Sequence, residues 1–155
     1  MAPHRKGSQP VMSAPMPDTQ PKPRVAHERV GDFLLMTHPH GDPTEAEWDE
    51  AVAAIRKAAD SGARGLLVHT IGGGPNAAQR KQVAEMWEAR GSMITIAVTT
   101  PSSMVRGVIT ALNWFLSRPI RAFATLEESM DYLDVPRVDR AEVVDVMQRL
   151  MRVVD

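Results

Sequence analysis

An apolar segment of strand length leads into an amphipathic helix four times along this chain. Short strands separated by one helix each pair in parallel through right-handed crossovers, so the alternation predicts an α/β fold. The helices are expected to start near Thr44, Asn76, Pro101 and Thr125. The strand candidates that precede them are Phe33–Thr37, Gly65–Thr70, Met93–Thr99 and Ile120–Ala124.

One more strand is expected before these four. Val25–Val30 alternates apolar and polar residues, and Gly31-Asp32 separates it from Phe33–Thr37 in the manner of a hairpin turn. The first strand should therefore lie antiparallel at the edge of the sheet. The sequence predicts a five-stranded, mixed and mostly parallel sheet with helices packed on it.

Residues that can cap helices precede the apolar stripes. Two capping boxes are expected, in which a Thr side chain and a Glu side chain three residues later satisfy backbone amides reciprocally. They pair Thr44 with Glu47 and Thr125 with Glu128. The third helix is expected to have Thr100 as its N-cap and Pro101 at its first position, where the missing amide costs little.

The helical periodicity also predicts which side chains are buried. In the second helix, Val83, Met86 and Trp87 are expected to point inward, and Gln79, Arg80, Lys81 and Glu88 outward. In the third helix, the predicted buried stripe consists of Val105, Val108, Ile109, Leu112, Phe115 and Leu116.

Composition limits the classes of function. The chain has 155 residues, which is one domain, and a formal net charge of −1, which gives no basic footprint for nucleic acid. Cysteine is absent, so thiolate chemistry and disulfides are excluded, and a cytoplasmic location is favoured. The apolar segments are too short to span a membrane, and no secretory signal is recognisable.

The chain divides into three parts. Residues 1–24 hold six of the prolines within their first 23 positions and are predicted to be a disordered, slightly basic arm. Residues 25–135 are the predicted α/β domain. Residues 136–155 follow Pro136 and are predicted to form an additional amphipathic helix.

The last helix is the main candidate for an interface. Its apolar side chains recur at helical spacing and are Val143, Met147, Leu150, Met151 and Val154. We expect them to contact another protein or a second copy of the chain; packing on the domain's own surface is the alternative. Trp114, one residue off the third helical stripe, is a further candidate interface anchor.

Three loops after strands hold candidate site residues, because ligands of open α/β sheets collect at the carboxyl ends of the strands. The loop Thr70, Ile71, Gly72, Gly73, Gly74 to Asn76 precedes a helix and could receive a protein partner or bind an anion or phosphate. Ser102 and Ser103 are interpreted mainly as helix-capping hydroxyls. His38, His40 and His69 are weak candidates for a small metal site. No complete catalytic motif is present, and no cofactor is expected.

Two segments resemble a known family. Ile94–Thr99 followed by Pro101–Arg106, and the strand and capped helix of Ile120–Leu133, resemble the STAS domain of SpoIIAA-type anti-sigma-factor antagonists and its SpoIIAA-like relatives. The resemblance covers roughly residues 25–135. It implies a non-enzymatic regulatory or scaffolding module that binds a partner protein through the loop after the third strand and the helix behind it.

The chain departs from that family at the switch loop. Antagonists of the switching type carry Asp-Ser-Ser/Thr-Gly there, with a serine that the partner kinase phosphorylates. This chain has His69-Thr70-Ile71-Gly72, in which only Thr70 offers a hydroxyl. The resemblance therefore implies partner binding but no serine phosphoswitch.

Overall fold

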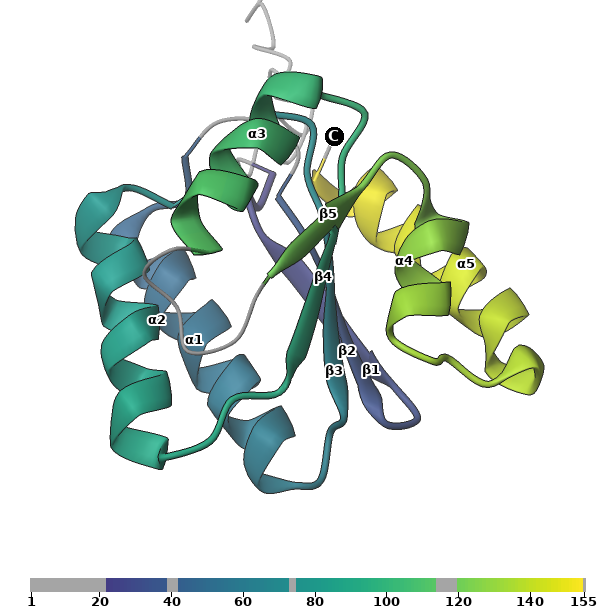
Figure 1. Cartoon of the computed structure of the whole chain (residues 1–155), viewed down its shortest axis with the longest axis horizontal. Coiled ribbons are helices and arrows are strands. Elements are labelled where there is room, and N and C mark those ends of the chain that lie inside the picture. The colour runs from purple at the N-terminus through teal and green to yellow at the C-terminus, as the bar shows by residue number, and fades with distance from the viewer. Residues whose placement is uncertain (1–21, 39–41, 73–74, 114–119, 155) are drawn as a thin grey trace, which may run out of the picture.

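The computed structural model describes residues 22–38, 42–72, 75–113 and 120–154, and within them five strands form one sheet in the order β1-β2-β3-β4-β5 (Figure 1). β1 is antiparallel to β2, and the three other neighbouring pairs are parallel. The predicted fold class is thus confirmed. The strands are β1 (Ala26–Val30), β2 (Phe33–Thr37), β3 (Gly65–His69), β4 (Thr95–Thr99) and β5 (Arg121–Phe123).

Helices cover both faces of the sheet (Figure 1). One face carries α1 (Glu45–Asp60), α2 (Ala77–Arg90) and α3 (Ser103–Leu112), and the other carries α4 (Leu126–Tyr132) and α5 (Arg137–Val154). Burial on both faces explains why the first four residues of β2 are all apolar, without polar alternation.

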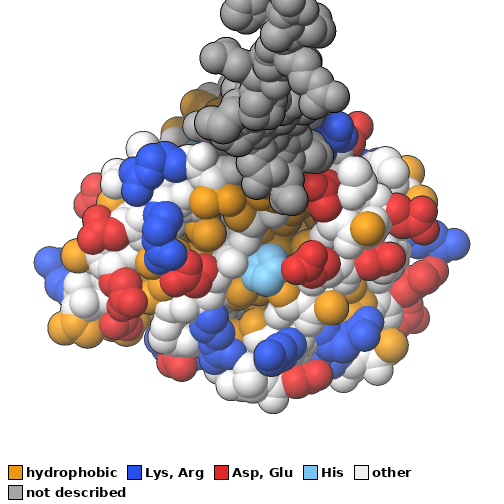
Figure 2. Space-filling model, turned by 180° about the vertical axis from the view of Figure 1, so that it is seen from behind, with side chains coloured by type: hydrophobic (Ala, Val, Ile, Leu, Met, Phe, Trp, Pro, Cys, Tyr) orange, Lys and Arg blue, Asp and Glu red, His pale blue; other side chains and the backbone are white. Residues whose placement is uncertain are grey.

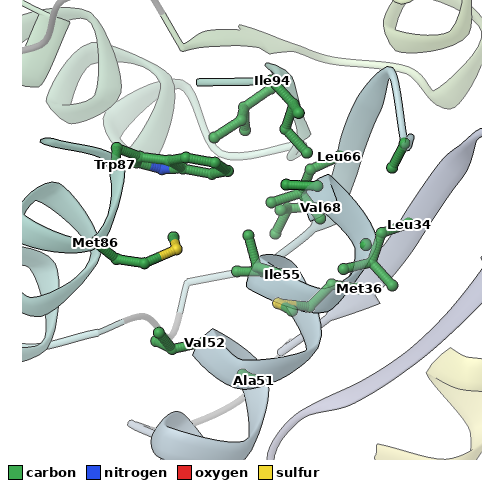
Figure 3. Close-up of a cluster of buried hydrophobic side chains, with 14 of the residues drawn as sticks. Leu34, Met36, Ala51, Val52, Ile55, Leu66, Val68, Met86, Trp87 and Ile94 are labelled. Atoms are coloured by element: carbon green, nitrogen blue, oxygen red, sulfur yellow. The ribbon is translucent and has the colours of Figure 1, made fainter. Parts of the chain in front are cut away.

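Alternate residues of each strand supply the two cores, because successive side chains point to opposite faces. On one face, Leu34, Met36, Leu66 and Val68 pack against α1 and α2 (Figure 3). Ile55 of α1 and the side chains of Met86 and Trp87 of α2 converge on them. On the other face, the core consists of Val30, Phe33, Leu35, Leu67, Ala97, Met130, Leu133, Val135, Val143, Val146, Met147 and Leu150.

The helix starts follow the predicted caps with two differences. The Thr44–Glu47 box is present, with the Glu47 amide 3.2 Å from Thr44 Oγ1 and the Thr44 amide 2.8 Å from Glu47 Oε2. At α4, Thr125 accepts from the Glu128 amide, but the Glu128 carboxylate bonds the Thr125 hydroxyl, so the predicted second box is only half formed. The N-cap of α3 is Ser102 and not Thr100, because Thr100 still continues the sheet edge.

The prediction that Gln79 points outward is wrong. Gln79 is 7% exposed, and it completes a capping box with Asn76 that the sequence interpretation missed. Its side-chain amide also donates to the carbonyl oxygen of Pro43 at 3.2 Å. The polar side chain of Gln79 is buried because it satisfies backbone groups of both the α2 start and the loop before α1.

The prediction of an intermolecular role for the last helix is also corrected. Val143 and Met147 are 0% exposed, Leu150 and Val154 are buried, and only Met151 of the predicted set is half-buried. α5 packs on β1 and β2, while the seven-residue α4 packs on β4 and β5. The short α4 cannot cover the whole face, so α5 completes the core, and Val143, Met147 and Leu150 are used there.

Ion pairing ties α5 to the edge strand. The guanidinium of Arg149 donates to both carboxylate oxygens of Glu28 in β1, at 2.9 and 3.0 Å. β1 and α5 are therefore in direct contact, through this ion pair and through their apolar side chains.

The Glu47 carboxylate gives a testable pH dependence. Slight burial raises its pKa, but hydrogen bonds from the amides of Thr44 and Arg24 outweigh this and hold the pKa below the ordinary value of 4.5. Since the folded pKa is the lower one, the stabilisation is complete above about pH 4.5 and is lost as the pH falls through the folded pKa. Glu47→Gln keeps the box geometry without the charge.

We expect the wild-type chain to exceed Glu47→Gln in free energy of unfolding by about 0.5–1 kcal/mol at neutral pH, with the difference vanishing in acid. Urea titrations of both proteins across this range measure it. A difference that is independent of pH would contradict the assignment.

Candidate functional site

The carboxyl ends of β2, β3 and β4 meet at one edge of the sheet. Thr37, His69 and Thr99 are register partners there. The backbone ladder continues one residue further: the amide of His38 donates to the His69 carbonyl at 3.1 Å, and that of Thr70 to the Thr99 carbonyl at 3.0 Å. The loops after the strands consequently leave from a firmly hydrogen-bonded base.

Hydroxyl groups at this edge bond within the domain. The Thr70 hydroxyl donates to the carbonyl oxygen of His38 at 3.3 Å, and the side chains of Thr99 and Ser129 share a hydrogen bond of 2.7 Å. Thr37 Oγ1 lies 3.4 Å from His69 Nδ1. The sequence analysis does not predict this polar row, because Thr99 ends a predicted strand and Ser129 lies in a predicted helix far along the chain. The register of β2, β3 and β4 and the packing of α4 on β4 bring these residues together.

The predicted loop after β3 is only partly displayed. Thr70 is 3% exposed, so its hydroxyl is not presented to a partner, whereas Ile71 is 41% exposed. A Cβ on Gly72 would meet nothing within 4 Å, so this part of the loop borders open space. Gly73 and Gly74 lie outside the described residues.

The start of α2 is already capped. The Asn76 side chain accepts from the Gln79 amide at 2.8 Å, and the Gln79 side chain accepts from the Asn76 amide at 2.9 Å. Two of the amides that an anion would use at this helix start therefore have partners within the chain.

The metal hypothesis gains no support from the described residues. They contain no group of three His, Asp or Glu side chains that could hold an ion. His38 is 7% exposed, and His69 is half-buried. His40, the third candidate ligand, lies outside the described residues.

Ser102 and Ser103 lie at the start of α3. Ser102 accepts from the Val105 amide at 3.2 Å and acts as the cap, while Ser103 is exposed. Trp114, the predicted interface anchor beyond this helix, lies outside the described residues. The hydroxyl of Ser102 is thus used in capping, and the outward surface of α3 itself is the better candidate site.

α3 presents an apolar surface to solvent. Met104 is 77% exposed and Val108 is 55% exposed. The neighbouring exposed side chains on the helix are small or uncharged, and the whole set, here named the α3 outer face, is Ser103, Met104, Gly107, Val108, Thr110 and Ala111. The one charged residue of α3, Arg106, is half-buried and donates to the carbonyl oxygen of Thr100 at 2.9 Å.

The exposure of Val108 corrects the predicted buried stripe. Val105 and Ile109 are half-buried, whereas Val108 faces solvent. α3 packs on β5, which has only three residues, so the apolar stripe is wider than the surface available to cover it. Of the remaining predicted stripe, the side chain of Leu112 and residues 115 and 116 lie outside what the structure describes.

The α3 outer face has no charged side chain, whereas charged side chains are present on the opposite side of the molecule (Figure 2). Figure 2 shows the side of the molecule opposite to the view of Figure 1, where Lys and Arg side chains are interspersed with Asp and Glu and neither sign forms a continuous patch. A concentrated basic surface of the kind that nucleic acids require is therefore not seen on that side. None of the helices in the described part of the chain has the length and apolarity needed to cross a membrane.

The comparisons with known proteins support the fold. No known family profile matches the chain, and no curated protein matches it. The structure is similar to the crystal structure of an uncharacterized protein of the DUF3478 family, with a SpoIIAA-like fold, from Shewanella loihica PV-4. The TM-score is 0.54 at 15% sequence identity, over 70% of this chain and 91% of the other. The domain accordingly has a SpoIIAA-like fold, as the sequence resemblance predicts.

Proposed function

We propose that this chain is a non-enzymatic regulatory or scaffolding protein that binds another protein through the α3 outer face and the loop at Ile71, which leaves the same edge of the sheet. The observation that carries the proposal is the exposure of Met104 and Val108 on a helix face without charges. Cores of protein interfaces are depleted in charged residues and enriched in methionine, so the chemistry of this face fits such a use.

The physical gain from covering the face is considerable. Full burial of a Val or Met side chain contributes about 1.5–3 kcal/mol, and two such side chains lie one helical turn apart here. Gly107 has nothing within 4 Å of a Cβ position, so a partner backbone could approach the helix closely between them. The surface is too small to bind tightly alone, which is why Ile71 is included.

The absence of enzymatic activity is part of the proposal. The hydroxyls at the carboxyl edge bond to one another or to backbone groups, and Thr70 and Thr99 are buried. Their arrangement supports a structural role at the base of the loops. Anion binding at the start of α2 is the rival function, and a large thermal shift with a nucleotide and no protein partner would replace the proposal.

The test compares capture of cellular proteins by two folded variants. Met104→Glu with Val108→Glu places two charges on the α3 outer face, and Ala84→Glu with Ala89→Glu places two on exposed positions of α2 as the matched control. We expect about a tenfold or greater loss of a bound protein for the α3 pair only, with both melting temperatures close to that of the wild type. Equal capture by both variants would contradict the proposal.

A further inference from the structure

We propose that residues 8–17 of the N-terminal arm bind the α3 outer face of the same chain and compete there with an external partner. The competition rests on the proposed function, whereas the intramolecular contact stands by itself. Three observations lead to it: where the arm joins the domain, how far it reaches, and what its uncharged segment matches.

The arm joins the domain at the edge where the candidate site lies. β1 is antiparallel to β2, and its first residue, Ala26, pairs with Thr37 at the carboxyl end of β2. The chain before β1 therefore leaves from the same edge as the loops after β3 and β4. The Arg24 amide donates to Glu47 Oε1 at 3.0 Å, and its guanidinium donates to the carbonyl oxygen of Asp42 at 2.9 Å. These contacts place Arg24 beside the start of α1, in the helical layer that also contains α3.

The distance is within reach. β1 and β5, the strand on which α3 packs, are separated by four strand spacings, or about 19 Å. A chain in polyproline II conformation rises about 3.1 Å per residue, so a segment as long as residues 17–24 can cover about 22 Å. Residues 8–17 can then extend over about 28 Å, which exceeds the ~15 Å length of a ten-residue helix such as α3.

Residues 8–17 and the α3 outer face share an uncharged, partly apolar composition. Residues 8–17 read Ser-Gln-Pro-Val-Met-Ser-Ala-Pro-Met-Pro and contain no charge, whereas Arg5, Lys6 and Asp18 flank them. The α3 outer face is likewise uncharged, whereas Lys, Arg, Asp and Glu side chains are dispersed among apolar and uncharged groups on the side shown in Figure 2. Three prolines restrict the free segment, so less conformational entropy is lost when it binds.

Tethering makes even a weak contact effective. A segment joined through a short linker acts at an effective concentration on the order of millimolar, because binding is intramolecular. A partner must then displace the segment, so its apparent association constant is the intrinsic one multiplied by the fraction of chains whose α3 outer face is free. The arm would thereby set a threshold for partner binding.

The test uses the full chain, which has no cysteine, so Ser8→Cys provides a single site for a nitroxide label. In nuclear magnetic resonance spectra, we expect the label to broaden the amide signals of Met104 and Val108 and to leave Gly62, which precedes β3 at the opposite edge, unaffected. Uniform broadening, or none at α3, would overturn the contact. Adding Val11→Glu and Met12→Glu should abolish the effect.

Two controls separate the possible outcomes. An isotope-labelled unmodified chain mixed with unlabelled nitroxide-bearing chain reports only intermolecular contact, and broadening at α3 there would assign the face to a second copy and overturn the proposal. Val11→Glu with Met12→Glu should increase capture of the external protein several-fold. Unchanged capture by this variant would overturn the competition alone. If the variant loses the broadening at α3, but neither it nor the chain without these substitutions captures a protein, the intramolecular contact is supported and the proposed function fails.

Discussion

Replacing Met147 by Glu is expected to unfold the domain and not to dissociate an assembly. Met147 is 0% exposed within the core that α5 forms with the sheet. Truncating a buried Met to Ala costs about 2–5 kcal/mol, and a carboxylate at the same place adds the cost of burying a charge without a partner. The total is comparable to the whole stability of a domain this size, about 5–15 kcal/mol.

Val138→Glu is the matched control, because Val138 belongs to the same helix but is 88% exposed. Its free energy of unfolding should stay within about 0.5 kcal/mol of the wild-type value. Circular dichroism during urea titration and size-exclusion chromatography measure stability and association together. A folded Met147→Glu monomer derived from a wild-type oligomer would restore the intermolecular interpretation of α5.

Replacing Trp48 by Ala is expected to have the second large effect. Trp48 of α1 is 5% exposed in the core shared with α2, and its indole Nε1 donates to the carbonyl oxygen of Gln79 at 3.1 Å. Trp48→Ala should cost about 3–5 kcal/mol through the lost contacts and the cavity. It should also loosen the position of α2 beside the candidate site.

Trp48→Phe separates the hydrogen bond from the packing. Phenylalanine keeps most of the apolar contact and loses the indole donor, so we expect a loss of only about 1–2 kcal/mol. Urea titrations with equal slopes for the three proteins make the values comparable. If Trp48→Phe were as destabilising as Trp48→Ala, packing would not be the dominant contribution of this side chain.

Local chemistry explains why most of the fold could be predicted. The Gly31-Asp32 turn identified an antiparallel first strand, and the Thr44–Glu47 box identified the start of α1. Both features are formed by residues that are close in sequence, so they can be recognised without knowing the rest of the fold. The predicted strand after Met93 begins instead at Thr95, because strand ends depend on which neighbouring strand supplies hydrogen bonds.

The predictions that failed concern which part of the fold, if any, covers the apolar face of a helix. Val143 and Met147 have the same periodicity whether they pack on the chain's own sheet or on a partner, and only the short α4 decides between these. Val108 belongs to an apolar stripe, but the three-residue β5 leaves it uncovered. The Thr70 hydroxyl is turned inward by a hydrogen bond to a residue 32 positions away, which no local pattern reveals.

The contact between Glu28 and Arg149 joins residues 121 positions apart and has a consequence for biosynthesis. The N-terminal hairpin leaves the ribosome first, but one face of it stays uncovered until α5, the last helix, has been made. α1 and α2 can pack on the first core earlier, because their contacts are closer in sequence. A nascent chain stalled before α5 would therefore expose Leu35 and Leu67 and be prone to aggregation.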